Sequence, residues 1–317
     1  MPPLLVLRLL LAVGLLANAA PAAAQRLLDW NGLAGPAPAA SQAPGSGAGR
    51  DAGRSWIRLQ PAAGGWTAEV GNPLPAPVQV RLSMRHEAYY RAVPALPATF
   101  VLAAGERRAL VRIYSLDSSQ AAPPLDLWLN AVPGPGDARP DDALYRLPFA
   151  GVPVRIDQGF GGAASHRELA NRYALDFALP VGTPVLAARA GRVIQVEAGF
   201  HEGGGDPALA TRANLVRILH RDGSMAVYAH LAADSVQVRP GQWVEAGTPL
   251  ADSGDTGFST GPHLHFAVQV NAGMRLAAIP FRMAGPLGEL RFPITAAGPD
   301  GDPAAGIGPP AAPSGPL

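Results

Sequence analysis

Between residues 54 and 150, short runs of alternating apolar and polar residues follow one another along the chain. The clearest runs are 78–82, 99–102 and 109–113, and segments containing proline and glycine separate them. A period of two residues is that of a β-strand, whose successive side chains point to opposite faces of a sheet. We therefore expect residues 54–150 to form a small antiparallel β-sandwich.

The region 151–285 is also rich in strand patterns. Turn signals stand at 221–223 (Arg-Asp-Gly) and 239–241 (Arg-Pro-Gly), and no long segment has the 3.6-residue period of a helix. Two similar stretches, 182–193 and 240–250, each read as a turn followed by a strand. We expect a second, antiparallel β domain here, and a mainly β fold for the whole chain.

Hairpins like these two stretches also occur in lipoyl and biotinyl carrier domains. Such carriers attach their cofactor to a lysine, and all 25 basic residues of this chain are arginine. The carrier interpretation therefore fails on chemistry. The chain has no cysteine either, which excludes disulfides, thiolate ligands and a cysteine nucleophile. Any metal ion must be bound by His, Asp or Glu.

Both ends of the sequence predict segments outside these domains. Residues 1–24 are typical of an export signal, with an apolar run at 9–17 and small residues at 22–24 where cleavage is expected. The alternative is an uncleaved membrane anchor, but the apolar run is shorter than the roughly 20 residues of a spanning helix. Residues 25–53 predict a flexible linker and 286–317 a mostly disordered tail.

The net charge of +1 argues against a nucleic-acid partner, which normally requires a concentrated basic surface. The export signal without a disulfide framework indicates the bacterial periplasm or cell envelope. After cleavage of the signal, we expect no stable membrane span.

The segment 259–266 (Ser-Thr-Gly-Pro-His-Leu-His-Phe) contains two histidines in a strand pattern. On a strand, His263 and His265 share one face, whereas Leu264 and Phe266 take the other. One imidazole of such a pair can bind a metal while the other transfers protons. The alternative is a pair of solvent-facing or merely hydrogen-bonded histidines.

Four motifs in sequence order resemble the lysostaphin/LytM type of zinc metallopeptidase, whose members cut peptide bonds in the bacterial cell wall. The motifs are Ser165-His166, residues 173–193, residues 227–231 (Val-Tyr-Ala-His-Leu) and residues 259–266. The resemblance covers about residues 155–282. It implies an endopeptidase of peptidoglycan crosslinks with one zinc ion.

The resemblance also implies a role for each site residue. The zinc ligands would be His166, Asp176 and His265, which leave a fourth position for water, as catalytic zinc requires. His230 and His263 would flank that water as catalytic residues that transfer protons or stabilise an oxyanion. The sequence does not divide these two roles. Independently of the resemblance, an acidic residue in the apolar strand pattern at 174–178 is costly to bury unless a cation compensates its charge.

One position departs from the family pattern. The first histidine of well-known members stands four residues before the aspartate, where this chain has Arg172. His166 stands ten residues before Asp176, and the glycine-rich segment 159–165 could bring it over the site. His201 and His220 are its competitors, and both are expected to be solvent-facing loop residues.

His86 has no motif around it and is expected on the surface. The spacing from Gly257 to His263 and His265 also fits the start of the cupin metal motif, but Gln269 and Val270 stand where that motif needs glutamate. A further alternative is a non-catalytic activator of cell-wall amidases with the same fold. Degenerate members of that kind lack parts of the metal site, whereas this chain can fill every position. Any cell-wall or division partner protein stays unidentified.

Overall fold

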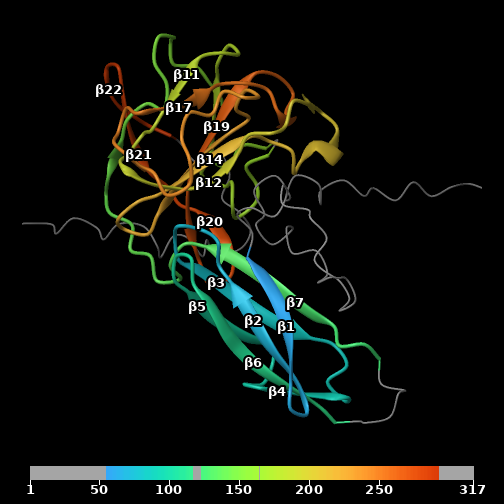
Figure 1. The fold of residues 1–317 in the computed structure, drawn as a ribbon. Helices are drawn as coiled ribbons and strands as arrows, with labels where there is room; N and C mark the ends of the chain where they lie inside the picture. Colours follow the sequence, from blue (N-terminus) through green and yellow to red (C-terminus); the bar gives the residue numbers. More distant parts are fainter. Residues whose placement is uncertain (1–54, 117–122, 164, 293–317) are drawn as a thin grey trace, which may run out of the picture.

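The structure, a computed structural model, describes residues 55–116, 123–163 and 165–292 (Figure 1). Almost all regular elements in these ranges are strands, and the helical exception is a single 3-10 turn at Pro207–Leu209. The predicted mainly β fold is therefore confirmed. None of the helical segments in the described ranges is long and apolar enough to cross a bilayer. The predicted signal, 1–24, and linker, 25–53, lie outside the described residues.

The first strands form two antiparallel sheets that face each other. One sheet has the order β1 (Trp56–Ala62), β2 (Gly65–Gly71), β6 (Arg107–Ser115) and β4 (Tyr90–Val93). The other has the order β5 (Ala98–Leu102), β3 (Val78–Met84) and β7 (Leu127–Pro133). The three alternating runs of the sequence thus lie in β3, β5 and β6. In β3, Val78, Val80 and Leu82 are fully buried, while the residues between them point outward.

The second region is built on a sheet of eight strands. Seven follow the order β16 (Trp243–Val244), β12 (Gly191–Glu197), β14 (Leu215–Leu219), β15 (Met225–Ala229), β19 (His263–Asn271), β10 (Leu175–Ala178) and β9 (Ile156–Gln158). The eighth, β20 (Leu276–Ala278), also pairs with β19, and all pairs in this sheet are antiparallel.

Smaller sheets complete the second region. The two similar stretches of the sequence pair with each other, β11 (Pro184–Leu186) with β17 (Pro249–Asp252) and β12 with β16. A short parallel pair joins β13 (Gly203–Gly204) to β18 (Gly257–Phe258). The last sheet has the order β22 (Gly288–Leu290), β21 (Arg282–Gly285) and β8 (Leu144–Tyr145). The described chain thus continues as a strand into the segment 286–317, where the sequence predicts a mostly disordered tail; residues 293–317 lie outside the described ranges.

The two faces of the eight-stranded sheet differ in character. One face carries Leu175, Phe177, Tyr228 and Phe266, which are all fully buried in one apolar core. Because side chains alternate along a strand, Asp176 must point to the opposite face. That opposite face holds the polar groups described below.

The sandwich packs against one end of this sheet (Figure 1). Ile194, Met225 and Leu276 belong to the same apolar core as the buried residues of the sandwich. The Asn271 side chain at the end of β19 donates to the Gly134 carbonyl at 3.2 Å. His263 stands at the opposite end of this nine-residue strand, about 27 Å away along an extended chain. The sandwich therefore adjoins the end of β19 that is remote from the paired histidines.

Candidate metal centre

Asp176 and His265 face each other across two neighbouring strands. They are direct register partners in the antiparallel pairing of β10 with β19. His265 Nδ1 donates to Asp176 Oδ1 at 2.9 Å, and both side chains are buried. Burial raises the pKa of Asp176, but its polar contacts with His166 and His265 lower it by more, so this pKa lies well below its usual range. A buried carboxylate therefore stays ionised at neutral pH.

His166 reaches the same carboxylate from the loop between β9 and β10. Its ring is fully buried, and its Nε2 lies 3.3 Å from Asp176 Oδ2. Its Nδ1 donates to the Gly159 carbonyl at 2.8 Å. A carbonyl only accepts, so Nδ1 carries the hydrogen and the neutral ring has its lone pair on Nε2. Either a proton or a cation must then lie between Nε2 and the carboxylate.

These three residues fit a divalent metal ion. Their ligand atoms all lie within 4.8 Å of one another. His166 Nε2 and His265 Nε2 are buried without a hydrogen-bond partner. Burial also lowers the pKa of His265, which keeps its ring neutral. Two imidazoles and one carboxylate are a donor set typical of catalytic zinc.

The other candidate histidines lie outside this group. His201 is exposed, as expected. The prediction of a solvent-facing His220 was wrong, because that residue is only 3% exposed. Its Nδ1 donates to the Ala190 carbonyl at 2.9 Å, and its ring packs edge-on against Tyr145. Both contacts are made by segments distant in sequence, which a local turn signal does not reveal. His86 is exposed, as predicted.

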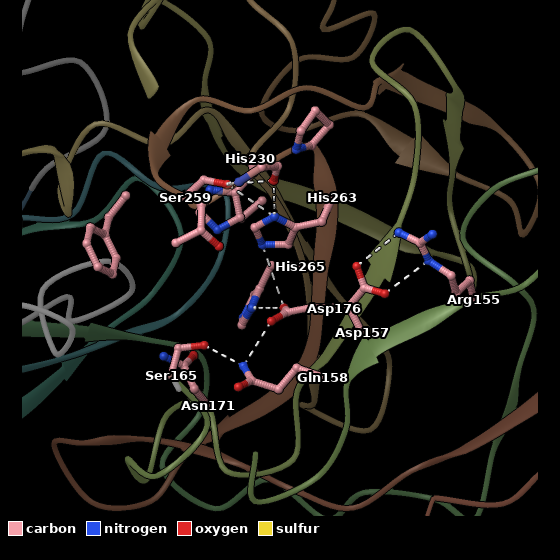
Figure 2. Close-up of a pocket in the computed structure, with 15 residues that line it drawn as sticks. Arg155, Asp157, Gln158, Ser165, Asn171, Asp176, His230, Ser259, His263 and His265 are labelled. Carbon is pink, nitrogen blue, oxygen red and sulfur yellow. Dashed lines mark hydrogen bonds and ion pairs between the residues drawn. The ribbon is translucent and has the colours of Figure 1, made fainter. Parts of the chain in front are cut away.

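His230 and His263 lie together beside the buried carboxylate (Figure 2). Their ring centroids are 4.5 Å apart, and His263 Nε2 is 3.9 Å from Asp176 Oδ1. His230 Nδ1 donates to the Thr256 carbonyl at 2.7 Å, and His263 Nδ1 to the Gly261 carbonyl at 2.8 Å. In the neutral form of either ring the lone pair is therefore on Nε2, where a proton can be accepted.

Two features distinguish His230. Burial lowers its pKa to about 3, with further lowering by His263 and His265, so the ring is neutral at pH 7. Its φ of 62° lies in the left-handed region, which costs a non-glycine residue roughly 1 kcal/mol or more. Strain of this kind clusters at functional sites. His230 directly follows the last residue of β15, and its ring lies against that of His263.

A groove of about 530 Å³ opens onto these groups. Asp176, His230, His263 and His265 line it, whereas His166 lies beneath its surface. Among the described residues, all those lining the groove come from the segment between Arg155 and His265. The described part of the sandwich contributes none of them.

Several polar residues of this groove were not predicted from the sequence, and Gln158 and Asn171 are two of them. Gln158 Nε2 donates to Asp176 Oδ2 at 3.0 Å and to Ser165 Oγ at 2.6 Å. Gln158 thus orients the carboxylate from the neighbouring strand β9. Asn171 lines the groove between His166 and Asp176 along the chain. Neither residue belongs to a recognisable motif, so no local signal could have found them.

Comparison with known proteins finds one protein family. Residues 170–276 match peptidase family M23. The chain is similar to lysostaphin of Staphylococcus simulans, with 40% identity over 101 residues, 32% of this chain and 18% of lysostaphin. It is also similar to the peptidoglycan DD-endopeptidase ShyA of Vibrio cholerae, with 34% identity over 136 residues, 41% of this chain and 29% of ShyA. The chain thus spans less than a third of the length of these two relatives.

Among solved structures, the catalytic domain of lysostaphin from Staphylococcus simulans aligns with 31% identity and a TM-score of 0.26. The alignment covers 41% of this chain and 84% of that domain. The matched family region, 170–276, contains Asp176, His230, His263 and His265 but not His166. The place of His166 beside Asp176 is therefore independent of the family match.

Proposed function

Residues 170–276 belong to peptidase family M23, and from that premise we propose that this protein is a zinc-dependent endopeptidase that hydrolyses peptide crosslinks of bacterial peptidoglycan. The main support is the cluster of His166, Asp176 and His265 at the groove. It combines one ionised carboxylate with two buried nitrogen atoms that have no hydrogen-bond partner. Relatives named for the cleavage of peptidoglycan or glycyl-glycine bonds support the choice of substrate.

His166, Asp176 and His265 would hold one zinc ion. When bound, zinc acidifies a water molecule and polarises a scissile carbonyl. The protein fixes these ligands in advance, because Gly159 sets the tautomer of His166 and Gln158 holds the carboxylate of Asp176. Such outer hydrogen bonds orient the ligands before any metal binds.

His230 and His263 supply the proton transfers of hydrolysis. Each presents an Nε2 lone pair toward the site, since each Nδ1 hydrogen is held by a backbone carbonyl. A neutral imidazole takes a proton from the attacking water, and the resulting imidazolium returns a proton to the leaving amine. The hydrogen bonds of both Nδ1 atoms support this proposal, which assigns the two transfers to the pair and neither transfer to one ring alone.

The alternative from the sequence is a non-catalytic activator of cell-wall amidases. An activator needs a binding surface but no ligand set, no fixed tautomers and no strained histidine. All five site residues and the hydrogen bonds that orient them are present in this chain. This completeness favours the enzyme.

We further propose that the protein is exported and acts in the periplasm or cell envelope. The export signal predicted at 1–24 and the peptidoglycan substrates named for the relatives support this location. Cleavage after Ala24 would release a chain that begins at Gln25. Peptide mapping of the mature N-terminus in a bacterial host would test this site.

Product analysis tests the proposed activity. Purified peptidoglycan is incubated with residues 25–317, with the His265→Ala variant and with chelated protein, and products are identified by mass spectrometry. We expect new amino and carboxyl ends at peptide crosslinks from the zinc-loaded protein alone, with activity restored to the chelated protein by zinc. Absence of products from folded, zinc-loaded protein would overturn the proposed hydrolysis and favour the activator.

A further inference from the structure

Asn171 is a buried polar residue of the groove that the mechanism above does not use. It stands on the loop between His166 and Asp176, lines the groove, and is only 5% exposed. Its backbone N–H donates to the Glu168 carbonyl at 2.9 Å, and its own carbonyl accepts from Ala174 at 2.8 Å. The backbone of this turn is thus fixed without help from the side chain.

The side chain of Asn171 lacks the hydrogen bonding expected at such a position. Its Oδ1 is buried and has no hydrogen-bond partner. An amide oxygen left unpaired in this way costs about 1–3 kcal/mol. A buried polar group without a hydrogen-bond partner is rare in native proteins, and a role in binding a ligand explains why one is retained.

Three other asparagines of the described chain are equally buried, and all three use their side chains structurally. Asn72 donates to the Ala76 carbonyl at 2.8 Å. Asn214 donates to the Phe200 carbonyl at 2.8 Å, and Asn271 Oδ1 accepts from a backbone N–H at 3.1 Å. Asn171 therefore differs from the other three asparagines, because its side-chain oxygen has no hydrogen-bond partner within the protein.

Its polar neighbours in the groove are already engaged. Figure 2 shows Asn171 beside Ser165 and Gln158, below Asp176. Gln158 bonds both Ser165 and Asp176. Ser259, at the other side of the groove, bonds the Gly261 carbonyl at 2.9 Å. Three buried side-chain oxygen atoms of the described residues have no hydrogen-bond partner, and of these the Asn171 oxygen is the one that belongs to a residue of the groove.

We propose that Asn171 is a substrate-binding residue whose side-chain oxygen accepts a hydrogen bond from a backbone N–H of the peptide in the groove. This inference rests on the proposed function, because it takes the ligand of the groove to be a peptide. An uncharged acceptor suits a peptide N–H, which is a neutral donor. Binding of the peptide completes the hydrogen bonding that the free protein leaves open.

Two variants test the inference. Asn171→Leu keeps the size of the side chain and removes its polar atoms, and Asn171→Ala serves if leucine does not fit. Thr99→Val, at an exposed threonine of β5 in the sandwich and outside the groove, is the control. Zinc content and melting temperature are measured for all of them, because a purely structural role would change these first.

The first arm measures equilibrium binding of crosslinked muropeptide dimers to chelated full-length protein. We expect binding to weaken about tenfold or more in Asn171→Leu and to be retained in Thr99→Val. The second arm measures cleavage of the same dimers by zinc-loaded protein, where KM should rise and zinc content should stay at the wild-type level. Since the first arm needs no catalysis, it decides on Asn171 even if the proposed hydrolysis fails.

Equal binding by wild type and both Asn171 variants would overturn the inference. So would a wild-type protein that binds no dimer, or a loss of zinc from the Asn171 variants, which would make Asn171 part of the metal site. Weakened binding without cleavage by the wild type would support the inference and contradict the proposed hydrolysis.

Discussion

The sandwich and the metal-site region bury their polar side chains in different ways. Among the described residues up to Pro133, Asn72 is the one buried polar side chain, and it both donates to Ala103 at 2.7 Å and accepts from Leu74 at 2.9 Å. All other buried polar or charged side chains of the described residues lie from His166 onward. The sandwich core is thus apolar apart from one satisfied side chain, whereas the metal-site region also buries polar groups, and those of the metal centre are among them.

The polar face extends beyond the site itself. Arg217 in β14 is 1% exposed, and its guanidinium donates to Gln195 at 3.2 Å and to Gln269 at 2.5 Å. Burial lowers the pKa of Arg217 to about 10, so it is still charged at neutral pH. Gln269 in turn donates to the Ala170 carbonyl at 2.7 Å. A buried cation thus helps to fix the loop that carries His166.

Removing the carboxylate of the metal site should give the largest loss of activity. In Asp176→Asn the ionised group between the two histidines is lost, so zinc binding should fail and activity should fall about a thousandfold or more. Peptidoglycan cleavage rates and metal content are the measurements. Wild-type activity in this variant would show that the buried charge has no catalytic purpose.

A proton-transfer residue should give the next largest effect and leave the metal in place. In His230→Gln, activity should fall about a hundredfold or more, because the Nε2 acceptor is lost, while zinc content stays at the wild-type level. Metal analysis alongside cleavage rates separates this case from ligand loss. Loss of zinc together with activity would instead place His230 among the ligands.

A core substitution in the sandwich should change the stability of the protein and leave its activity unchanged. Leu82 is fully buried in β3, so Leu82→Ala should lower the free energy of unfolding by about 3 kcal/mol. Arg81→Ala, its exposed neighbour on the same strand, is the control. Denaturant titration measures the change, and activity per folded molecule should equal that of the wild type. A matching fall in the activity of folded protein would mean that the two regions are functionally coupled.

The smallest expected effect concerns pH and a buried histidine outside the site. Burial lowers the pKa of His220 to about 4 in the folded state, against 6.5 when unfolded. The stability contributed by the neutral ring is complete above pH 6.5 and is lost as pH falls toward 4. At pH 5 the loss should be about 2 kcal/mol.

His220→Asn retains a donor for the Ala190 carbonyl and removes the titration. Denaturant titration of zinc-free protein at pH 7 and pH 5 should therefore show a smaller loss of stability in this variant than in the wild type. Parallel losses in both proteins would show that His220 does not titrate as its burial requires.

The sequence predicted those parts of the fold that depend on local pattern. Period-two runs predicted β3, β5 and β6, and the apolar strand around Asp176 predicted that its carboxylate would need a cation. The wrong prediction concerned His220, whose burial depends on Tyr145 and Ala190, far away in the sequence. Likewise, the packing of the sandwich against Met225 depends on surface shape, which no alternation of residue types encodes.

Metal analysis of the purified protein tests whether His166, Asp176 and His265 bind zinc. Full-length wild type, His166→Ala and the exposed-histidine control His201→Ala are prepared identically with zinc and analysed for bound metal. We predict one zinc ion per chain in the wild type and the control, and none in His166→Ala. Zinc bound equally by His166→Ala, or no zinc in the wild type, would contradict this prediction.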